Sequence, residues 1–346
     1  MKQLPTDTSA SLSDVQLWRK GAMNNAYLKS RRWLAALWTA SQPLALVGVM
    51  MVFDFAACLV AMIFDHRQIT GINAWIKPAK FGLSSAVTCL TLAWIASYLG
   101  NWSRIRNWAG RAFAASIAIE IAVIDLQAAR GTTSHFNMAG SLDRVAFITM
   151  GISIATLWLS MVAIAYALMR QKFQPVSWAW ALRLGLLLSV VGTAGGGFML
   201  RQTPEQKEHP ELKQFGSHTV GAPDGGPGLP VLNWSENHGD LRVAHFLGLH
   251  GVQVIPLVGW LLLCKKRLSE LQRTRLVWLA SGTYTSCFAL LAWQALRGQA
   301  LLQPDQKTLV MASLLILFTA IGSWFSLSST TFSGLKKWAA VLEVHS

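Results

Sequence analysis

The sequence predicts an all-α fold, a polytopic membrane bundle of about eight transmembrane helices, from its composition and from its recurring apolar stretches. Of 346 residues, 53% are apolar and 13% are Asp, Glu, Lys or Arg, whereas a soluble domain carries roughly 25% charged residues. The mean hydropathy is +0.38. So few charged residues cannot cover a soluble globule, which excludes a soluble enzyme, a disordered tail and a secreted disulfide scaffold.

Eight stretches reach the roughly 20 apolar residues that a bilayer-crossing helix needs. The last is the weakest of them and is alternatively a re-entrant segment. Within the fifth, glycine and serine steps at 185–189 and 192–196 predict close helix packing. Within the sixth, Pro256 predicts a kink. The eight predicted spans are about 44–64, 78–99, 110–129, 145–169, 178–200, 242–264, 276–296 and 308–328.

The distribution of basic residues predicts the orientation of the bundle. Nineteen of the 30 Lys and Arg residues fall on the side of the N-terminus and 11 on the other side. Because cytoplasmic loops are enriched in Lys and Arg, both termini are expected in the cytoplasm of a bacterial-type inner membrane. The same bias explains the net charge of +14, so the lipid bilayer, and no nucleic acid, is the expected partner.

The chain divides into three predicted parts. Residues 1–42 form a cytoplasmic or interfacial segment, 43–329 the transmembrane bundle, and 330–346 a cytoplasmic tail. The stretch from Asp14 to Trp38 is expected to be helical, either lying on an anionic leaflet or solvated. One long outer loop, 201–241, is rich in Gly and Pro, and a loop of this length is usually functional or disordered.

Histidines gather on the outer side of the predicted bundle, and His245 and His250 lie inside the sixth span. In an unbroken helix, Arg242, His245, His250 and Gln253 would share one sector about 140° wide. Ionisable residues inside membranes usually mark functional sites. We therefore expect catalytic roles for His245, His250, Asp240 and Glu120, unless the imidazoles only hydrogen-bond between helices.

A metal or haem site is a second interpretation of the same imidazoles. His135 follows the third span beside Ser134, and it could join the two imidazoles of the sixth span as a metal ligand. The alternative for this short segment is a turn stabilised by its Ser and Asn side chains. The predicted metal ligands are therefore His135, His245 and His250, with haem or a transition metal as the candidate cofactor.

Three cations on the outer side predict an anion site. Lys77 and Lys80 lie where the second span begins, at the positive end of the helix dipole, which favours an anion. Arg242 is the third member. The expected anion is a lipid phosphate, a substrate carboxylate or a haem propionate. The alternatives are snorkelling of the lysines to the headgroups or pairing with Asp65.

Acidic residues inside the spans predict a proton relay through Asp54, Glu120 and Asp125. Alternatively, these carboxyl groups hydrogen-bond to Gln127 or Arg183.

Three functions follow from these features. The first is a membrane-embedded, metal- or haem-dependent enzyme, with the oxidoreductase class favoured, whose site faces outward. The second is a proton-coupled transporter of small molecules. The third is a non-catalytic membrane scaffold or sensor. An anionic lipid or a small-molecule substrate is the expected ligand of the polar site.

Overall fold

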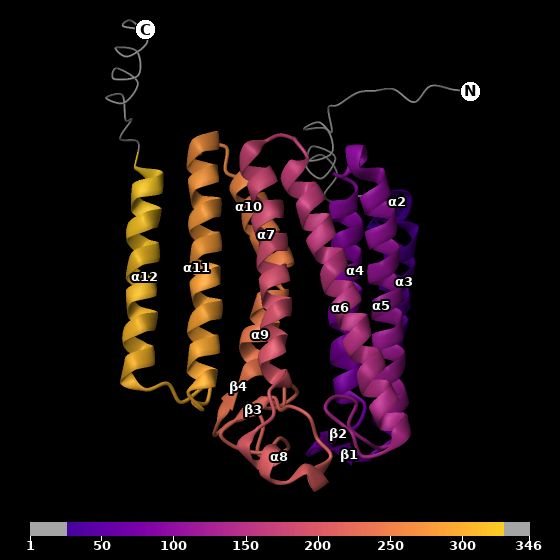
Figure 1. Ribbon diagram of the computed structural model, residues 1–346. Helices are drawn as coiled ribbons and strands as arrows, with labels where there is room; N and C mark the ends of the chain where they lie inside the picture. Colours follow the sequence, from indigo (N-terminus) through magenta and orange to yellow (C-terminus); the bar gives the residue numbers. More distant parts are fainter. Residues whose placement is uncertain (1–25, 329–346) are drawn as a thin grey trace, which may run out of the picture.

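The computed structural model describes residues 26–328 of the chain, with side chains from Arg32 onward. The described residues form an elongated bundle of parallel and antiparallel helices, which confirms the all-α prediction (Figure 1). The helices are α2 (Ala26–Ala40), α3 (Gln42–Phe64), α4 (Ile76–Ala96), α5 (Ser103–Ala129), α6 (Ser141–Arg170), α7 (Val176–Gly195), α8 (Pro204–Glu208), α9 (Leu241–Leu249), α10 (Gly251–Leu263), α11 (Glu270–Leu296) and α12 (Gln306–Leu327).

Seven helices in residues 26–328 are long and apolar enough to cross a membrane, and the bent pair α9–α10 makes up to eight spans. The predicted eight stretches correspond to these helices, and α12 is a continuous helix of span length. Most helices extend beyond the predicted spans, because their ends carry polar residues that a count of apolar residues leaves out. For example, α5 begins at Ser103 and α6 at Ser141.

One end of the bundle carries most of the structure outside the long helices, and we call it the loop end (Figure 1). It comprises segments 65–75, 130–140, 196–240 and 297–305. Two small antiparallel strand pairs lie there, in which Gln68 faces Asn73 and Thr219 faces Asp240. Their strands are β1 (Gln68–Ile69), β2 (Ile72–Asn73), β3 (Thr219–Val220) and β4 (Gly239–Asp240), and the short 3₁₀ helices nearby are η2 (Gly196–Leu200) and η3 (Pro210–Leu212).

The long predicted loop is therefore built from short elements and is fixed to the bundle. At Gly239, an added Cβ would lie 2.0 Å from the Ala295 carbonyl oxygen, so β4 packs directly on the end of α11. Thr203 caps α8 by accepting from the Gln206 N–H, and the Gln206 side-chain amide donates to the Gly216 carbonyl oxygen over 2.8 Å. These contacts give segment 201–241 a defined conformation at the loop end of the bundle.

The core lies between α3, α4, α5, α6, α7 and α10. Its largest fully buried side chains are apolar, and they include Leu44, Leu92, Phe113, Leu168 and Leu182. Helix α2 joins this core through Leu37, which is 2% exposed. The predictions for residues 1–25 and for the tail 330–346 lie outside the described residues.

The sixth predicted span is broken at His250. Helices α9 and α10 meet there at an angle of 48°, six residues before Pro256, so the expected kink at the proline is wrong in position. The break lies where the bent pair crosses α7, and glycines on both sides let the two backbones come into contact there. A Cβ added to Gly192 would lie 2.2 Å from the Gly248 carbonyl carbon, and one added to Gly185 would lie 2.9 Å from the Gly251 carbonyl oxygen. The predicted close packing of the fifth span is confirmed.

Side chains from two neighbouring helices satisfy the carbonyl groups that the break releases. Ser189 Oγ on α7 donates to the Leu249 carbonyl oxygen over 2.7 Å, and the Tyr284 hydroxyl on α11 donates to that of Leu247. A backbone carbonyl left without a donor in a membrane costs several kcal/mol. The break is thus stabilised by its surroundings, as are most sharp helix bends.

We predict that Gly192→Val destabilises the protein by about 1–3 kcal/mol or more, because the new side chain would overlap the backbone of α9. Thermal unfolding of the purified protein in detergent, followed by tryptophan fluorescence, measures this change. Gly282→Ala on α11 is the control, since a Cβ at that position meets nothing within 4 Å. An unchanged unfolding temperature in Gly192→Val would contradict the close crossing.

Candidate functional site

The site is built around Lys77 and Lys80 at the start of α4. The β1–β2 hairpin turns the chain back, and α4 begins at Ile76, so both lysines lie in its first turns. The alternative expectation that the lysines pair with Asp65 is wrong. The Asp65 carboxylate accepts hydrogen bonds from Arg67 at 2.6 Å and from Trp75 Nε1 at 2.8 Å. The hydrogen bonds from Arg67 hold the pKa of Asp65 below its usual range.

In the part of the chain that the structure describes, both lysines donate to neutral acceptors only. Lys77 Nζ donates to His135 Nδ1 over 3.0 Å, and Lys80 Nζ donates to the Leu232 carbonyl oxygen over 2.8 Å. Within residues 26–328, neither lysine forms an ion pair with a carboxylate. Two half-buried ammonium groups one helical turn apart repel each other, so positive charge is concentrated at this end of α4 without a direct ion pair in residues 26–328.

His135 connects Lys77 to a buried carboxyl group. Its Nε2 lies 3.7 Å from Glu120 Oε1, and the Glu120 side chain is 3% exposed. Neither carboxyl oxygen of Glu120 accepts a hydrogen bond from any described residue. Because the lysine can only donate, we infer that Nδ1 of His135 is the acceptor and that its Nε2–H faces Glu120. Burial and the nearby charge of Lys77 lower the pKa of His135 well below its ordinary value, so the ring is neutral at pH 7.

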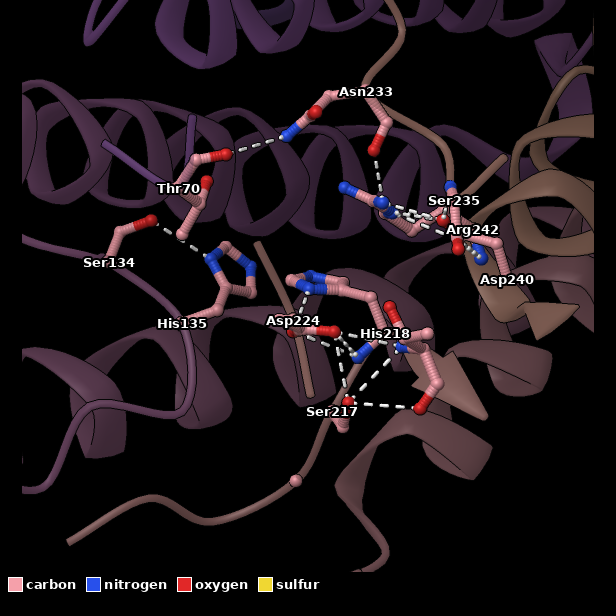
Figure 2. Close-up of polar contacts among 12 residues, drawn as sticks. Thr70, Ser134, His135, Ser217, His218, Asp224, Asn233, Ser235, Asp240 and Arg242 are labelled. Atoms are coloured by element: carbon pink, nitrogen blue, oxygen red, sulfur yellow. Dashed lines mark hydrogen bonds and ion pairs between the residues drawn. The ribbon is translucent and has the colours of Figure 1, made fainter. Parts of the chain in front are cut away.

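His218 is a second imidazole of the site, which the sequence had not singled out. Its ring lies beside that of His135, with centroids 6.4 Å apart, and Figure 2 shows the two rings next to each other below Arg242. Asp224 accepts from His218 Nδ1 over 2.7 Å and from the backbone N–H groups of His218 and Thr219. The carboxylate therefore fixes the ring and leaves Nε2 of a neutral His218 without a proton.

The pKa values of this dyad follow from burial and from these bonds. Burial lowers the pKa of His218 below its ordinary value, and the contact with Asp224 offsets only part of that effect. Burial raises the pKa of Asp224, but the bonds from His218 and from the backbone outweigh it and hold the pKa below its usual range. The sequence predicted only that His218 lies in an outer loop. Its pairing with Asp224 was not predictable, because Asp224 lies six residues further on in a Gly-rich segment without a regular pattern.

His245 and His250 point toward different helices because of the break between α9 and α10. His245 Nδ1 donates to the Gly192 carbonyl oxygen on α7 over 2.9 Å. His250 Nδ1 lies 3.2 Å from Gln253 Oε1, and its Nε2 lies 3.4 Å from Ser84 Oγ on α4. The expected single sector on an unbroken helix is therefore wrong. His245 lies on the side of His135 and His218. His250 lies beside Phe246, with ring centroids 4.4 Å apart.

Arg242 is near the lysines, but its own anion is Asp240. The guanidinium donates to both carboxylate oxygens of Asp240 and to the Asn233 carbonyl oxygen (Figure 2). Asp240 is 1% exposed, caps α9 through the Arg242 N–H and accepts from the Ser235 N–H. These contacts are those of a structural residue, whereas the catalytic role expected for Asp240 stays a prediction.

The acidic residues of the predicted relay lie in two places. Asp54, Cys58 and Asp125 bring their oxygen and sulfur atoms within 4.8 Å of one another, and no other such group of three metal-ligating side chains occurs in residues 26–328. Gly82 makes room for Asp54, since a Cβ there would lie 2.5 Å from its Oδ2. Glu120 faces His135 instead.

The alternative partners expected for these acidic residues are wrong. Gln127 donates to Asp143 Oδ1 over 3.0 Å, and Arg183 donates to backbone carbonyl oxygens at the end of α6. His135, His245 and His250 do not form a group of three ligand atoms within 4.8 Å, because His250 turns toward Ser84. Comparison of the chain with protein-family models, with curated proteins and with solved structures gave no match.

We predict that the stability of the protein falls as the pH falls below about 6.5. The folded-state pKa values of His135 and His218 lie below their ordinary values. Their neutral forms therefore contribute stability that is complete above the unfolded pKa and is lost as the pH falls toward the folded pKa. Unfolding temperatures measured from pH 8 to pH 5 should show this slope, and His135→Gln should reduce it.

His66→Gln is the matched control, because His66 is an exposed histidine of the same end. It should leave the slope unchanged. Equal slopes in wild type and His135→Gln would mean that His135 is not held neutral by burial.

Proposed function

We propose that the loop end of this membrane protein binds a small anionic ligand and exchanges protons with it. The observation that carries the proposal is the pair Lys77 and Lys80, two half-buried ammonium groups whose only acceptors within residues 26–328 are an imidazole and a backbone carbonyl. A ligand carboxylate or phosphate would supply the missing negative charge with short, charge-assisted hydrogen bonds. Arg242 contributes to the positive field, although Asp240 compensates its own charge.

Acid–base chemistry is supported by the imidazoles beside these cations. A neutral histidine within reach of a bound ligand can accept a proton, and one next to a carboxyl group can pass it on. His135 has Lys77 on one side and Glu120 on the other. His218 has an Asp partner that fixes its ring. The reaction class we favour is proton transfer to or from a bound anion by a membrane-embedded enzyme.

The bias of Lys and Arg toward the opposite end supports an outward-facing site. On that basis, we propose that the loop end faces the periplasm and that both termini are cytoplasmic, in a bacterial-type inner membrane.

A metal- or haem-dependent oxidoreductase is the second candidate. It is favoured by His218 and His245, each of which donates its Nδ1–H to a fixed acceptor, Asp224 or the Gly192 carbonyl. This is the arrangement that metal-binding histidines use, because it leaves Nε2 free for the ion. Metal analysis and a reduced-minus-oxidised absorption spectrum of the purified protein separate the two candidates.

We predict that sulfate stabilises the purified protein and that Lys77→Gln and Lys80→Gln each weaken its binding about tenfold or more. This factor corresponds to the ~1.5–3 kcal/mol of a hydrogen bond to a charged group. The shift of the unfolding temperature with sulfate concentration gives the affinity. Lys207→Gln is the control, because Lys207 is an exposed lysine on α8. Equal sulfate dependence in all four proteins would remove the lysines from anion binding.

Proton exchange is tested by the same ligand, since sulfate does not titrate near pH 7. An anion bound beside His135 and His218 should raise their pKa values, so binding should take up protons. Calorimetric titrations in two buffers of different ionisation enthalpy measure that uptake. His135→Gln should reduce it while sulfate still binds, and unchanged uptake would contradict a role for His135 as the proton acceptor.

A further inference from the structure

Helix α12 is attached to the bundle along one side only. Figure 1 shows it at the edge of the bundle with α11 as its neighbour, and 6% of its most apolar 18-residue stretch is buried. The two helices touch in the half away from the loop end, where Thr283 and Thr319 share a hydrogen bond of 2.9 Å and Leu279 packs on Gly322. At the loop end itself, Arg297 pairs with Asp305.

Between these two attachments an open groove of about 750 Å³ runs along the two helices. Its walls are mostly apolar, and the small side chains of Ser286 and Ala289 widen it on the α11 side. The lining residues are Ser286, Ala289, Leu290 and Trp293 of α11 with Gln306, Lys307, Val310, Met311 and Leu315 of α12. Its volume lies in the range of ligand pockets, about 300–1,000 Å³.

The dimensions of the groove fit one leaflet of a bilayer. From Lys307 to Leu315 the α12 axis advances by about 12 Å, at 1.5 Å per residue. Half of a hydrocarbon core of about 30 Å is about 15 Å. The groove begins at the first turn of α12, beside the Arg297–Asp305 pair, and runs toward the middle of the span. It therefore has the depth of an acyl chain and its mouth at the level of the headgroups.

The charge at the mouth selects among lipids. Arg297 stacks on the Trp293 ring at 4.2 Å and is neutralised by Asp305. Lys307 has no ion pair in residues 26–328 and is the one uncompensated charge among the side chains that line the groove. A cation at the membrane surface attracts anionic headgroups.

We propose that the groove between α11 and α12 binds an anionic phospholipid of the leaflet at the loop end, with one acyl chain between the helices and its phosphate at Lys307. The site uses none of the residues of the anion site around Lys77, so the two proposals stand or fall separately. A lipid bound in this groove would also add apolar contacts between α11 and α12, which few direct polar contacts hold together.

Native mass spectrometry of the full chain, released from detergent with phosphatidylglycerol or phosphatidylcholine added, tests this proposal. Wild type should retain one phosphatidylglycerol in preference to phosphatidylcholine. Lys307→Gln should lower that preference roughly fivefold, as expected for the ~1 kcal/mol of a basic residue at the membrane surface, and Lys307→Arg should keep it. Ala289→Trp should fill the groove and abolish lipid retention.

Ile148→Trp on α6 is the control for the bulky substitution, since its side chain faces outward and is 52% exposed. It should retain lipid as wild type does. Unchanged retention in Ala289→Trp, or an unchanged preference in Lys307→Gln, would overturn the proposal. Efficient disulfide cross-linking of Ala289→Cys between two chains in native membranes would also overturn it, because a second copy would then occupy the groove. An unfolding temperature within the wild-type range shows that each variant is folded.

Discussion

The crossing of α7 with the bent pair α9–α10 is the contact on which the rest of the loop end depends. Two glycines, Gly192 and Gly248, let the backbones meet at a distance that no side chain would permit. At this distance the Gly192 carbonyl reaches His245, and Ser189 reaches a carbonyl that the helix break releases. The break then gives α9 a direction of its own. Because Asp240 caps α9 and holds Arg242, the crossing also sets where the third cation lies relative to the start of α4.

At the loop end, some charged residues have a partner of opposite charge and others have none within ion-pair distance. Asp240 neutralises Arg242, and three N–H donors surround Asp224. Within residues 26–328, Lys77, Lys80 and Glu120 form no direct ion pair with a fixed charge, although a half-buried cation or a buried carboxylate is costly without such a partner. Evolution commonly keeps such costs at functional sites. This contrast between compensated and uncompensated groups is what distinguishes a binding site from a polar network that only holds the loops in place.

The fold was largely predictable from the sequence, because the length and polarity of the apolar stretches are set by the bilayer. The site was predictable in part. The positions of Lys77 and Lys80 at the start of a helix followed from the span boundary, whereas His135 was expected beside the imidazoles of the sixth span and its contact with Lys77 was not. The arrangement of His245 and His250 was not, because angular positions on a helix wheel assume a continuous helix. The break arises from packing against α7 and from hydroxyl groups of Ser189 and Tyr284, which are remote in sequence.

His218 and its partner show a second limit of the same kind. A histidine in a polar outer loop has no periodic pattern that distinguishes a site residue from a solvated one, and the Asp224 turn that fixes the ring is only visible once the loop is folded. The loop is in turn fixed by the site: the Lys80 ammonium binds the Leu232 carbonyl and Arg242 binds that of Asn233. The cations therefore position the segment that covers them, and a ligand anion that takes over these hydrogen bonds must compete with the backbone of that segment. The proposed binding of an anion would for this reason be coupled to the conformation of residues 229–236, since the same N–H donors cannot serve both fully.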